Sequence, residues 1–373
     1  MENILVLAND FIGAYGSLNC YVQELVMALR KKKIHVLVAN TVAEALAAYD
    51  NNEIDFSIGI GKYSYFWKGY PLYDLYHKLH YHWIIDNPLK MEIDTVSSYI
   101  KYVLIDKLFS LCMEKVQNPV LYLPIGVPKT KSNSRIKKKN GIVFAGQIRD
   151  SNTLLKEINN SSNKTEIIKM LEPLMLNLDL PYIPELMKNV GGMSPSIRKA
   201  TFALTNSFLR AYKREKVLSE IKEIPLTIIG EVRSKELLNK KNLTIVGKVP
   251  YYKSFEIMRQ YRFSLNIEPN FNCGFHDRVV RSAVQGNVVI TNYSKMQFDV
   301  WGNAALYYSY SAIDRITNRI LCLQENELEE MGDRLSQVTL LNFSWDRIIE
   351  FLLCDYGGTK DNAKNRLFGI LGN

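Results

Sequence analysis

Residues 243–292 read LTIVGKVPYYKSFEIMRQYRFSLNIEPNFNCGFHDRVVRSAVQGNVVITN and contain three short apolar runs separated by two segments with helical spacing. The second of these segments begins near His276. Its apolar residues share one side of a helix: Val279, Val280, Ala283 and Val284. The pattern predicts strand, helix, strand, helix and strand in that order. Short apolar strands that alternate with helices are typical of βαβ units, so this segment belongs to a domain with a parallel sheet.

The same alternation continues on both sides of this segment and forms two sets of strands. The first set lies at residues 4–8, 34–40, 55–61, 81–88 and 119–126. The second set lies at residues 141–150, 225–230, 243–247, 262–266, 287–291 and 305–308. A helical region interrupts the second set, and the residues from about 311 to 356 are also helical in pattern. The predicted fold class is therefore α/β, with two Rossmann-like domains facing a cleft and a helical C-terminal tail.

Length and composition agree with this division. A chain of 373 residues is longer than one compact core usually requires, and 47% apolar with 23% charged residues is ordinary for a globular protein. Disordered, collagen-like and coiled-coil chains are excluded on composition. The predicted segments are an N-terminal domain at 1–128, a basic linker at 129–140, a C-terminal domain at 141–340 with a helical insertion at 152–222, and a C-terminal helix and tail at 341–373.

The cysteine pattern and the N-terminal sequence indicate the cellular compartment of the protein. Five cysteines, an odd number spread over the chain without a CxxC pair, indicate reduced thiols rather than disulfides or a zinc site. The N-terminus lacks the basic segment of a signal peptide, and no stretch of about 18 apolar residues could cross a bilayer. The sequence therefore predicts a cytoplasmic protein.

Most of the net charge of +9 is concentrated in one segment. KTKSNSRIKKKN, residues 129–140, contains six basic residues and no acidic one. Such a polar segment between apolar runs is first of all a solvated linker. The second interpretation is attraction to an anionic membrane surface, which would place the protein peripherally at the inner face of the membrane. No nucleic-acid-binding motif is present, so no nucleic-acid partner is predicted.

The loop EPNFNCGF and the helix that follows it form a candidate phosphate site. The free N–H groups of a helix N-terminus favour an anion, and here the helix starts near His276, with Gly274 before it and Arg278 and Arg281 within it. The alternative is that both arginines are solvated surface residues. Spacing alone leaves the two interpretations open.

Residues 243–292 resemble the donor-binding half of the GT-B glycosyltransferases, which use nucleotide sugars, and are most similar to the CgeB-type branch of the family-1-like enzymes. The positions that match are Gly247, Val249, Tyr251, Leu265, Asn266, Pro269, Gly274, Arg278, Val279, Ala283, Gly286 and residues 289–291. Weaker matches lie in WIIDNP, at Trp83, Asp86 and Pro88, in the crossing segments around the linker, and in the tail NFSWDRIIEFLL.

This resemblance implies that the C-terminal domain binds a nucleoside-diphosphate sugar, a UDP- or GDP-sugar, and that the N-terminal domain receives a glycan, lipid-linked or protein acceptor. Residues 247–251, with Gly247, Val249 and Tyr251, would face the nucleobase. The diphosphate would meet His276, Arg278 and Arg149. The glycine-containing loops that follow the first strand of each domain complete the implied donor site with Gly13 and Gly146.

One departure concerns the paired glutamates of many retaining GT-B enzymes. This sequence has Cys273 and Arg281 at those two positions, so Arg281 either binds phosphate or is structural. No DxD-like metal motif is present, and no cofactor is expected besides the donor. Fixed cations and a helix dipole would stabilise the leaving diphosphate in place of a metal. Candidates for the base that accepts the acceptor proton are Asp86, Asp10 and His82, each with the alternative of a turn or capping role.

Two further alternatives stay open. The segment YSYFWKGYPLYDLYHKLHYHW, residues 63–83, contains nine aromatic residues and three histidines, which is typical either of an acceptor platform or of a packed core. The predicted function is a metal-independent glycosyltransferase. Its alternative is a non-catalytic GT-B-fold scaffold or partner subunit of a glycosylation complex, and the presence of Arg278 and of the acidic candidates favours the enzyme.

Overall fold

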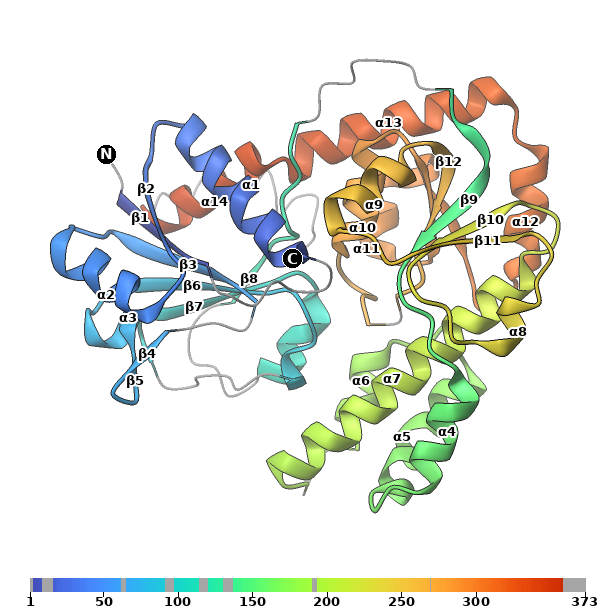
Figure 1. Cartoon of the computed structure of the whole chain (residues 1–373), viewed down its shortest axis with the longest axis horizontal. Helices are drawn as coiled ribbons and strands as arrows, with labels where there is room; N and C mark the ends of the chain where they lie inside the picture. The colour runs from blue at the N-terminus through green and yellow to red at the C-terminus, as the bar shows by residue number, and fades with distance from the viewer. Residues whose placement is uncertain are drawn as a thin grey trace. The chain divides into compact units, whose positions relative to one another are not determined.

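The computed structural model describes residues 3–8, 16–61, 65–90, 97–113, 120–129, 137–189, 193–268 and 270–357. The chain divides into two compact units (Figure 1). Unit 1 comprises Met1–Lys129 together with Leu340–Asn373, and unit 2 comprises Thr130–Thr339. Each unit contains a six-stranded sheet whose strands pair in parallel, so the α/β fold class with two parallel sheets is confirmed.

Unit 1 has the strand order β2-β1-β3-β6-β7-β8. Its strands are β1 (Asn3–Leu7), β2 (His35–Ala39), β3 (Phe56–Ile60), β6 (Leu79–Ile84), β7 (Ile100–Leu104) and β8 (Leu121–Tyr122). Its helices are α1 (Ser17–Lys31), α2 (Val42–Asn51), α3 (Leu72–Leu75) and α14 (Trp345–Tyr356). Leu5 and Leu7 of β1 pack with Ala45 and Tyr49 of α2 in one core of the unit.

The C-terminal helix α14 returns to unit 1 and packs beside α1 (Figure 1). The indole Nε1 of Trp345 donates to Glu24 Oε2 of α1 at 3.0 Å. The same ring leaves no space beside Gly126, where a Cβ atom would lie 2.3 Å from Trp345. Because the ring and the glycine fit each other, the first and last parts of the chain share one folded unit.

Unit 2 has the strand order β11-β10-β9-β12-β13-β14. Its strands are β9 (Lys139–Ala145), β10 (Leu226–Ile229), β11 (Leu243–Gly247), β12 (Tyr261–Leu265), β13 (Val288–Asn292) and β14 (Leu306–Tyr308). Its helices outside the insertion are α8 (Lys235–Leu238), α9 (Tyr251–Met258), α10 (Asp277–Val284), α11 (Lys295–Trp301), α12 (Ile313–Cys322) and most of α13 (Glu325–Phe343).

Successive side chains of β9 point to opposite faces of this sheet. Ile142 and Phe144 join the large core with residues of α8 and α12, whereas Val143 joins a smaller core with Phe255 and Met258 of α9. A strand with period-two side chains that are apolar on both faces must be covered on both faces. The central position of β9 in the sheet follows from this double burial.

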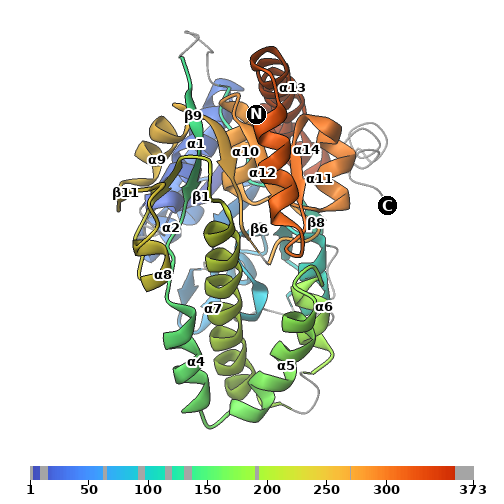
Figure 2. The same cartoon turned by 90° about the vertical axis from the view of Figure 1, so that its right-hand side faces the viewer.

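The helical insertion lies between β9 and β10 in the chain, and Figure 2 shows its four helices side by side. Its helices are α4 (Ser151–Asn159), α5 (Lys164–Leu176), α6 (Tyr182–Met187) and α7 (Pro195–Glu220). Asp150 caps α4 by accepting from Thr153 N at 2.8 Å, and Ser194 caps α7 ahead of Pro195. Because only residues 146–150 separate α4 from β9, the insertion begins at the carboxyl edge of the sheet.

The structure differs from the sequence prediction at three places. The strand β7 and the hairpin of β4 (Phe66–Trp67) with β5 (Tyr70–Pro71) were not predicted. The predicted linker is too long, because β9 begins at Lys139, and Lys138 Nζ donates to the carbonyls of Gln285 and Gly286. Residues 130–136 lie outside the described residues, and the attraction of this segment to a membrane stays a prediction.

Within the described residues, no helix is both long enough and apolar enough to span a bilayer.

Candidate functional site

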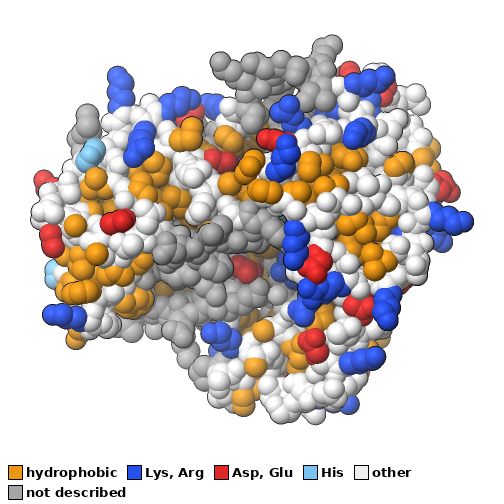
Figure 3. All heavy atoms as spheres, in the orientation of Figure 1, with side chains coloured by type: hydrophobic (Ala, Val, Ile, Leu, Met, Phe, Trp, Pro, Cys, Tyr) orange, Lys and Arg blue, Asp and Glu red, His pale blue; other side chains and the backbone are white. Residues whose placement is uncertain are grey.

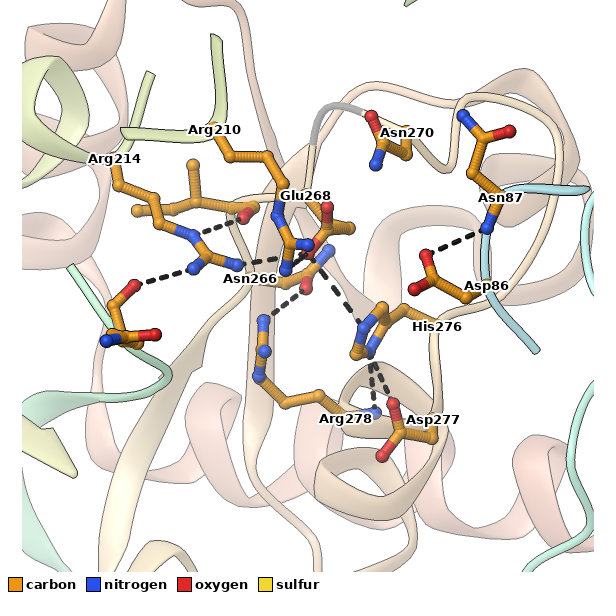
Figure 4. Close-up of polar contacts among 12 residues, drawn as sticks. Asp86, Asn87, Arg210, Arg214, Asn266, Glu268, Asn270, His276, Asp277 and Arg278 are labelled. Atoms are coloured by element: carbon orange, nitrogen blue, oxygen red, sulfur yellow. Dashed lines mark hydrogen bonds and ion pairs between the residues drawn. The ribbon is translucent and has the colours of Figure 1, made fainter. Parts of the chain in front are cut away.

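The carboxyl edge of the unit 2 sheet has a topological switch point. The chain runs from β9 to β10 and β11 on one side and then continues with β12 on the other side of β9. The loops after β9 and β12 therefore leave in opposite directions, and open α/β sheets bind ligands at such a place. Gly146 follows β9. Asn266 and Glu268, which Figure 4 labels, follow β12.

The loop after β9 is held tightly against the end of β10. Gly146 N donates to Ile229 O at 2.9 Å, and Ile148 N donates to Glu231 O at 2.8 Å. Gly230 has a φ of 145°, and a Cβ atom there would lie 2.4 Å from Gly146 O. Only glycine fits both conditions, so this loop has a fixed backbone at the switch point.

The N-terminus of α10 presents a histidine and an aspartate in contact. His276 is the N-cap residue, and its Nδ1 lies 2.6 Å from Asp277 Oδ1 and 3.2 Å from Arg278 N. The Tyr251 hydroxyl of α9 donates to Asp277 Oδ2. Burial raises the pKa of Asp277, but His276 and Tyr251 outweigh that effect and hold it well below its usual range. Asp277 is therefore an ionised carboxylate that fixes His276 at the start of α10.

Arg278 reaches from α10 toward the loop after β9. Its Nη1 donates to Asn266 Oδ1 at 3.2 Å, and its guanidinium lies 5.3 Å from the centre of the Phe144 ring. A Cβ atom on Gly146 would lie 3.6 Å from Arg278 Nη2, so the guanidinium adjoins the glycine loop. A fixed cation, a glycine loop and the first turn of α10 thus meet at the switch point.

Three residues of this site were not predicted from the sequence: Arg210 and Arg214 of α7, and Glu268. The Glu268 carboxylate is buried, and its Oε2 accepts from Arg210 Nη2 at 3.2 Å and from Arg214 Nη2 at 3.1 Å. Arg214 Nη1 also donates to Gln147 O at 2.7 Å. Burial raises the pKa of Glu268, but Arg210 and Arg214 lower it more strongly, to about 2.

A sequence signal for this cluster exists in α7. Arg210, Lys213 and Arg214 fall at positions i, i+3 and i+4, which is one face of a helix. Lys213 is fully buried and lies 4.5 Å from the centre of the Tyr310 ring, and burial lowers its pKa to about 8. A basic face beside buried Leu209 is unusual for a solvated helix, and this combination could have indicated the site.

The other predicted donor residues have varied surroundings. Arg149 Nη2 lies 4.0 Å from Glu157 Oε1 of α4. Gly247 has a positive φ of 85°, and Val249 packs against the small core under α9. The carbonyl of Gly274 accepts from Gln297 Nε2 at 2.9 Å, which fixes the loop before α10.

Arg281 has a packing role. Its side chain is buried, and its guanidinium lies 5.5 Å from the Tyr251 ring and 5.6 Å from the Phe255 ring. These contacts join α10 to α9 by cation–π interactions. Of the two interpretations that the sequence left open for Arg281, the structure gives support to the structural one.

The candidate bases belong to unit 1. Asp86 is exposed just after β6, and its Oδ1 accepts from Asn87 N at 2.8 Å (Figure 4). His82 lies inside β6 with its Nε2 2.5 Å from Gly61 O, and burial lowers its pKa to about 4. Asp10 and Gly13 lie outside the described residues. Asp86 is thus at a strand end, whereas His82 is in the sheet interior.

In the aromatic segment 63–83, some side chains are buried, as in a packed core, and others are exposed, as an acceptor platform requires. Tyr73, Tyr81 and Trp83 are buried, as expected of a core. Phe66 and Tyr70 of the β4–β5 hairpin are 56% and 65% exposed, and hydrophobic side chains reach the surface on the face of unit 1 shown in Figure 3. Within the described residues, no group of three or more His, Cys, Asp or Glu side chains could hold a metal ion.

Similarity to known proteins is found in structure rather than in sequence. No protein-family model and no curated protein matches the sequence. AviGT4, a glycosyltransferase involved in avilamycin A biosynthesis, is 10% identical with a TM-score of 0.58, covering 96% of this chain and 97% of its own. Phage T4 β-glucosyltransferase is 12% identical with a TM-score of 0.55, and the match covers 95% of this chain and 99% of the phage enzyme. An α-glucosyltransferase in complex with UDP and a 13-mer DNA containing an HMU base is 8% identical with a TM-score of 0.52, covering 95% and 99%.

These matches extend over nearly the whole of each chain, so the chain has the GT-B fold. The predicted resemblance to GT-B enzymes is confirmed at the level of the fold. The finer resemblance to the CgeB-type branch stays a prediction.

Proposed function

We propose that the protein is a glycosyltransferase that moves a sugar from a nucleoside-diphosphate sugar to a hydroxyl, or another nucleophile, of a glycan, lipid-linked or protein acceptor. The observation that carries the proposal is the position of Arg278. Its guanidinium adjoins the Gly146 loop beside the N-terminus of α10, at the switch point of a GT-B-type sheet. This combination suits a diphosphate, because N–H groups and a fixed cation converge there.

The proposed reaction breaks the bond between the anomeric carbon and the diphosphate oxygen, and the bonding electrons leave with the diphosphate. Arg278 and the first turn of α10 would stabilise the charge that develops there. The acceptor oxygen forms the new bond to the anomeric carbon, and its proton passes to a base. We assign that base to Asp86, which is exposed at the end of β6, with Asp10 and His82 as the other candidates.

UDP and GDP are the proposed nucleotides. Support for UDP comes from the α-glucosyltransferase of similar fold, which was crystallised with UDP. That structure also contains a 13-mer DNA with an HMU base, whereas this sequence has no nucleic-acid-binding motif. DNA containing the HMU base therefore serves as a test acceptor that we expect to be inactive.

Calorimetric titration with UDP, GDP, ADP, CMP and dTDP in EDTA tests the donor site. We expect one nucleoside diphosphate to bind without a divalent metal, and Arg278→Ala to weaken it at least tenfold, since a charge-assisted hydrogen bond contributes about 1.5–3 kcal/mol. Arg319→Ala, an exposed arginine of α12 in the same unit, is the matched control and should bind as the wild type does.

Release of free nucleoside diphosphate from the matching sugar donor distinguishes the enzyme from its alternative. A non-catalytic scaffold could bind the nucleotide without cleaving the sugar donor, even with every candidate acceptor present. Absence of binding by every nucleotide would contradict the proposed donor site itself.

A further inference from the structure

Two arginines of the helical insertion share one buried carboxylate. Arg210 and Arg214 both donate to Glu268 Oε2, and these three side chains carry a formal charge of +1. The two arginines differ in exposure, because the Arg214 side chain is 6% exposed and the Arg210 side chain is 30% exposed. Arg214 is therefore the interior member of this triad, and Arg210 is the member that reaches solvent.

Arg214 anchors α7 to the loops at the switch point. Besides its bond to Glu268, it donates to Gln147 O of the loop after β9 and to Ile267 O after β12. Replacement of any one of these partners would disturb the others, because a single guanidinium holds all of them. The position of α7 at this edge is thus tied to the same loops that hold Arg278.

Arg210 lies beside the N-terminus of α10. The Glu268 Oε2 atom that accepts from Arg210 lies 3.9 Å from His276 Nε2, and His276 is the N-cap of α10 (Figure 4). The Arg210 guanidinium and the His276 imidazole are therefore neighbours around one oxygen atom. An anion at the first turn of α10 comes within the reach of a flexible arginine side chain at this position.

Resting on the proposed function, we propose that Arg210 is a diphosphate ligand supplied by the helical insertion, and that Glu268 is the positioning residue that holds Arg210 for this role. A planar guanidinium can donate to a carboxylate and to a phosphate from different N–H groups. A bound diphosphate would balance the excess positive charge of Arg210, Arg214 and Glu268. The helical insertion then belongs to the donor site rather than being an appendage of the domain.

The electrostatics of Arg214 agree with this excess of positive charge. Burial, together with the like charges of Arg210 and Arg278, lowers the pKa of Arg214 to about 9, although the Glu268 carboxylate opposes this shift. A second anion beside Arg210 would relieve this repulsion. Glu268 Oε1 is also buried without a hydrogen-bond partner among the described residues, so the carboxylate is not saturated by the contacts that hold Arg210.

Titration calorimetry with inorganic diphosphate, and with the nucleoside diphosphate and monophosphate of one base, tests the role of Arg210 in the full-length protein. We expect Arg210→Ala to weaken both diphosphate ligands about tenfold or more, and to affect the monophosphate less. Arg210→Lys should recover part of the loss because it retains the charge but not the fork of donors. The matched control is Lys216→Ala on the same helix, whose partner is Glu220 at 2.9 Å.

The role of Glu268 is tested by Glu268→Gln and by its combination with Arg210→Ala. If Glu268 acts by positioning Arg210, the single Gln variant weakens diphosphate binding, and adding it to Arg210→Ala causes little further loss. A purely structural Glu268 would give additive losses of diphosphate affinity, which would overturn its assigned role. Circular dichroism of each variant confirms that the comparison is made between folded proteins.

The outcomes separate this inference from the proposed function. Equal binding of a nucleoside diphosphate by the wild type and Arg210→Ala would overturn the inference and leave the proposed function standing. Binding of inorganic diphosphate that depends on Arg210, with no added affinity from any nucleoside, would support the inference and contradict the proposed donor. If neither ligand binds the wild type, both are overturned.

Discussion

Replacement of Glu268 by Gln should destabilise unit 2 in a way that depends on pH. The pKa of this carboxyl falls from 4.5 to about 2 on folding, because the charges of Arg210, Arg214 and other cations outweigh the effect of burial. Each pKa unit corresponds to about 1.4 kcal/mol, so ionised Glu268 contributes about 3 kcal/mol to the free energy of unfolding. Removal of one member of a buried ion pair costs a similar amount, about 3–5 kcal/mol.

The pH range follows from the direction of the shift. A carboxyl whose pKa is lowered by folding contributes its stability above the unfolded value, here 4.5. That contribution is lost as the pH falls from 4.5 toward 2, because the wild-type carboxyl becomes protonated. The difference between the wild type and Glu268→Gln should therefore be largest at pH 7 and should shrink steadily below pH 4.5.

Urea unfolding with pulsed hydrogen exchange measures this difference in the intact chain. Peptides from β10 and β12 report on unit 2, and peptides from β3 and β6 of unit 1 provide an internal control that should not change. If Glu268→Gln lowers the free energy of unfolding by less than about 1 kcal/mol at pH 7, far below the cost of breaking a buried ion pair, the reasoning about Glu268 is refuted. A difference that stays constant down to pH 3 would refute it as well.

Other substitutions test separate parts of the account. Gly230→Ala should lower the stability of unit 2 by about 2 kcal/mol or more in thermal unfolding, because its Cβ would lie 2.4 Å from Gly146 O. Gly247→Ala, whose Cβ would have nothing within 4 Å, should cost only about 1 kcal/mol of backbone strain. The His82 imidazole should stay neutral at pH 6 in an NMR titration, and a titration midpoint above 6 would contradict its burial. Because the pKa of His82 is lower in the folded than in the unfolded chain, unit 1 should lose stability as the pH falls from 6.5 toward 4. Arg281→Met should lower the melting temperature while leaving nucleoside-diphosphate affinity within about twofold, since the wild-type side chain packs on two rings; a tenfold loss in calorimetry would instead identify a phosphate contact.

The alternation of strands and helices could be predicted because each strand of a parallel sheet is a short apolar run in the sequence. The strand β7 was missed where this signal is interrupted, since Lys101 is the second of the five residues IKYVL. In the structure, Lys101 Nζ lies 2.7 Å from Asp355 of α14, and this carboxylate stabilises the charge on the strand. The two residues are 254 positions apart, so local patterns could not reveal the pairing.

The candidate site was partly predictable for the same reason. The Gly146 loop and the first turn of α10 are local features, with the glycine or cap residue directly beside the strand or helix that it serves. The pairing of Arg210 with Glu268 joins residues 58 positions apart, on a helix and a loop that no short motif connects. Three basic residues on one face of α7, beside the apolar Leu209, are a local signal for a cationic cluster, but they do not identify Glu268 as the carboxylate that pairs with it.

The hydrogen-exchange footprint of a bound nucleoside diphosphate tests the central claim most directly. With the nucleotide that binds most tightly, we predict slower exchange in residues 146–150, in the loop after β10 at 230–233 and in the first turn of α10 at 276–280. Arg278→Ala should remove this protection at the same nucleotide concentration. Protection confined to other parts of unit 2, or to unit 1 alone, would contradict the claim that the donor diphosphate binds at the switch point of the unit 2 sheet.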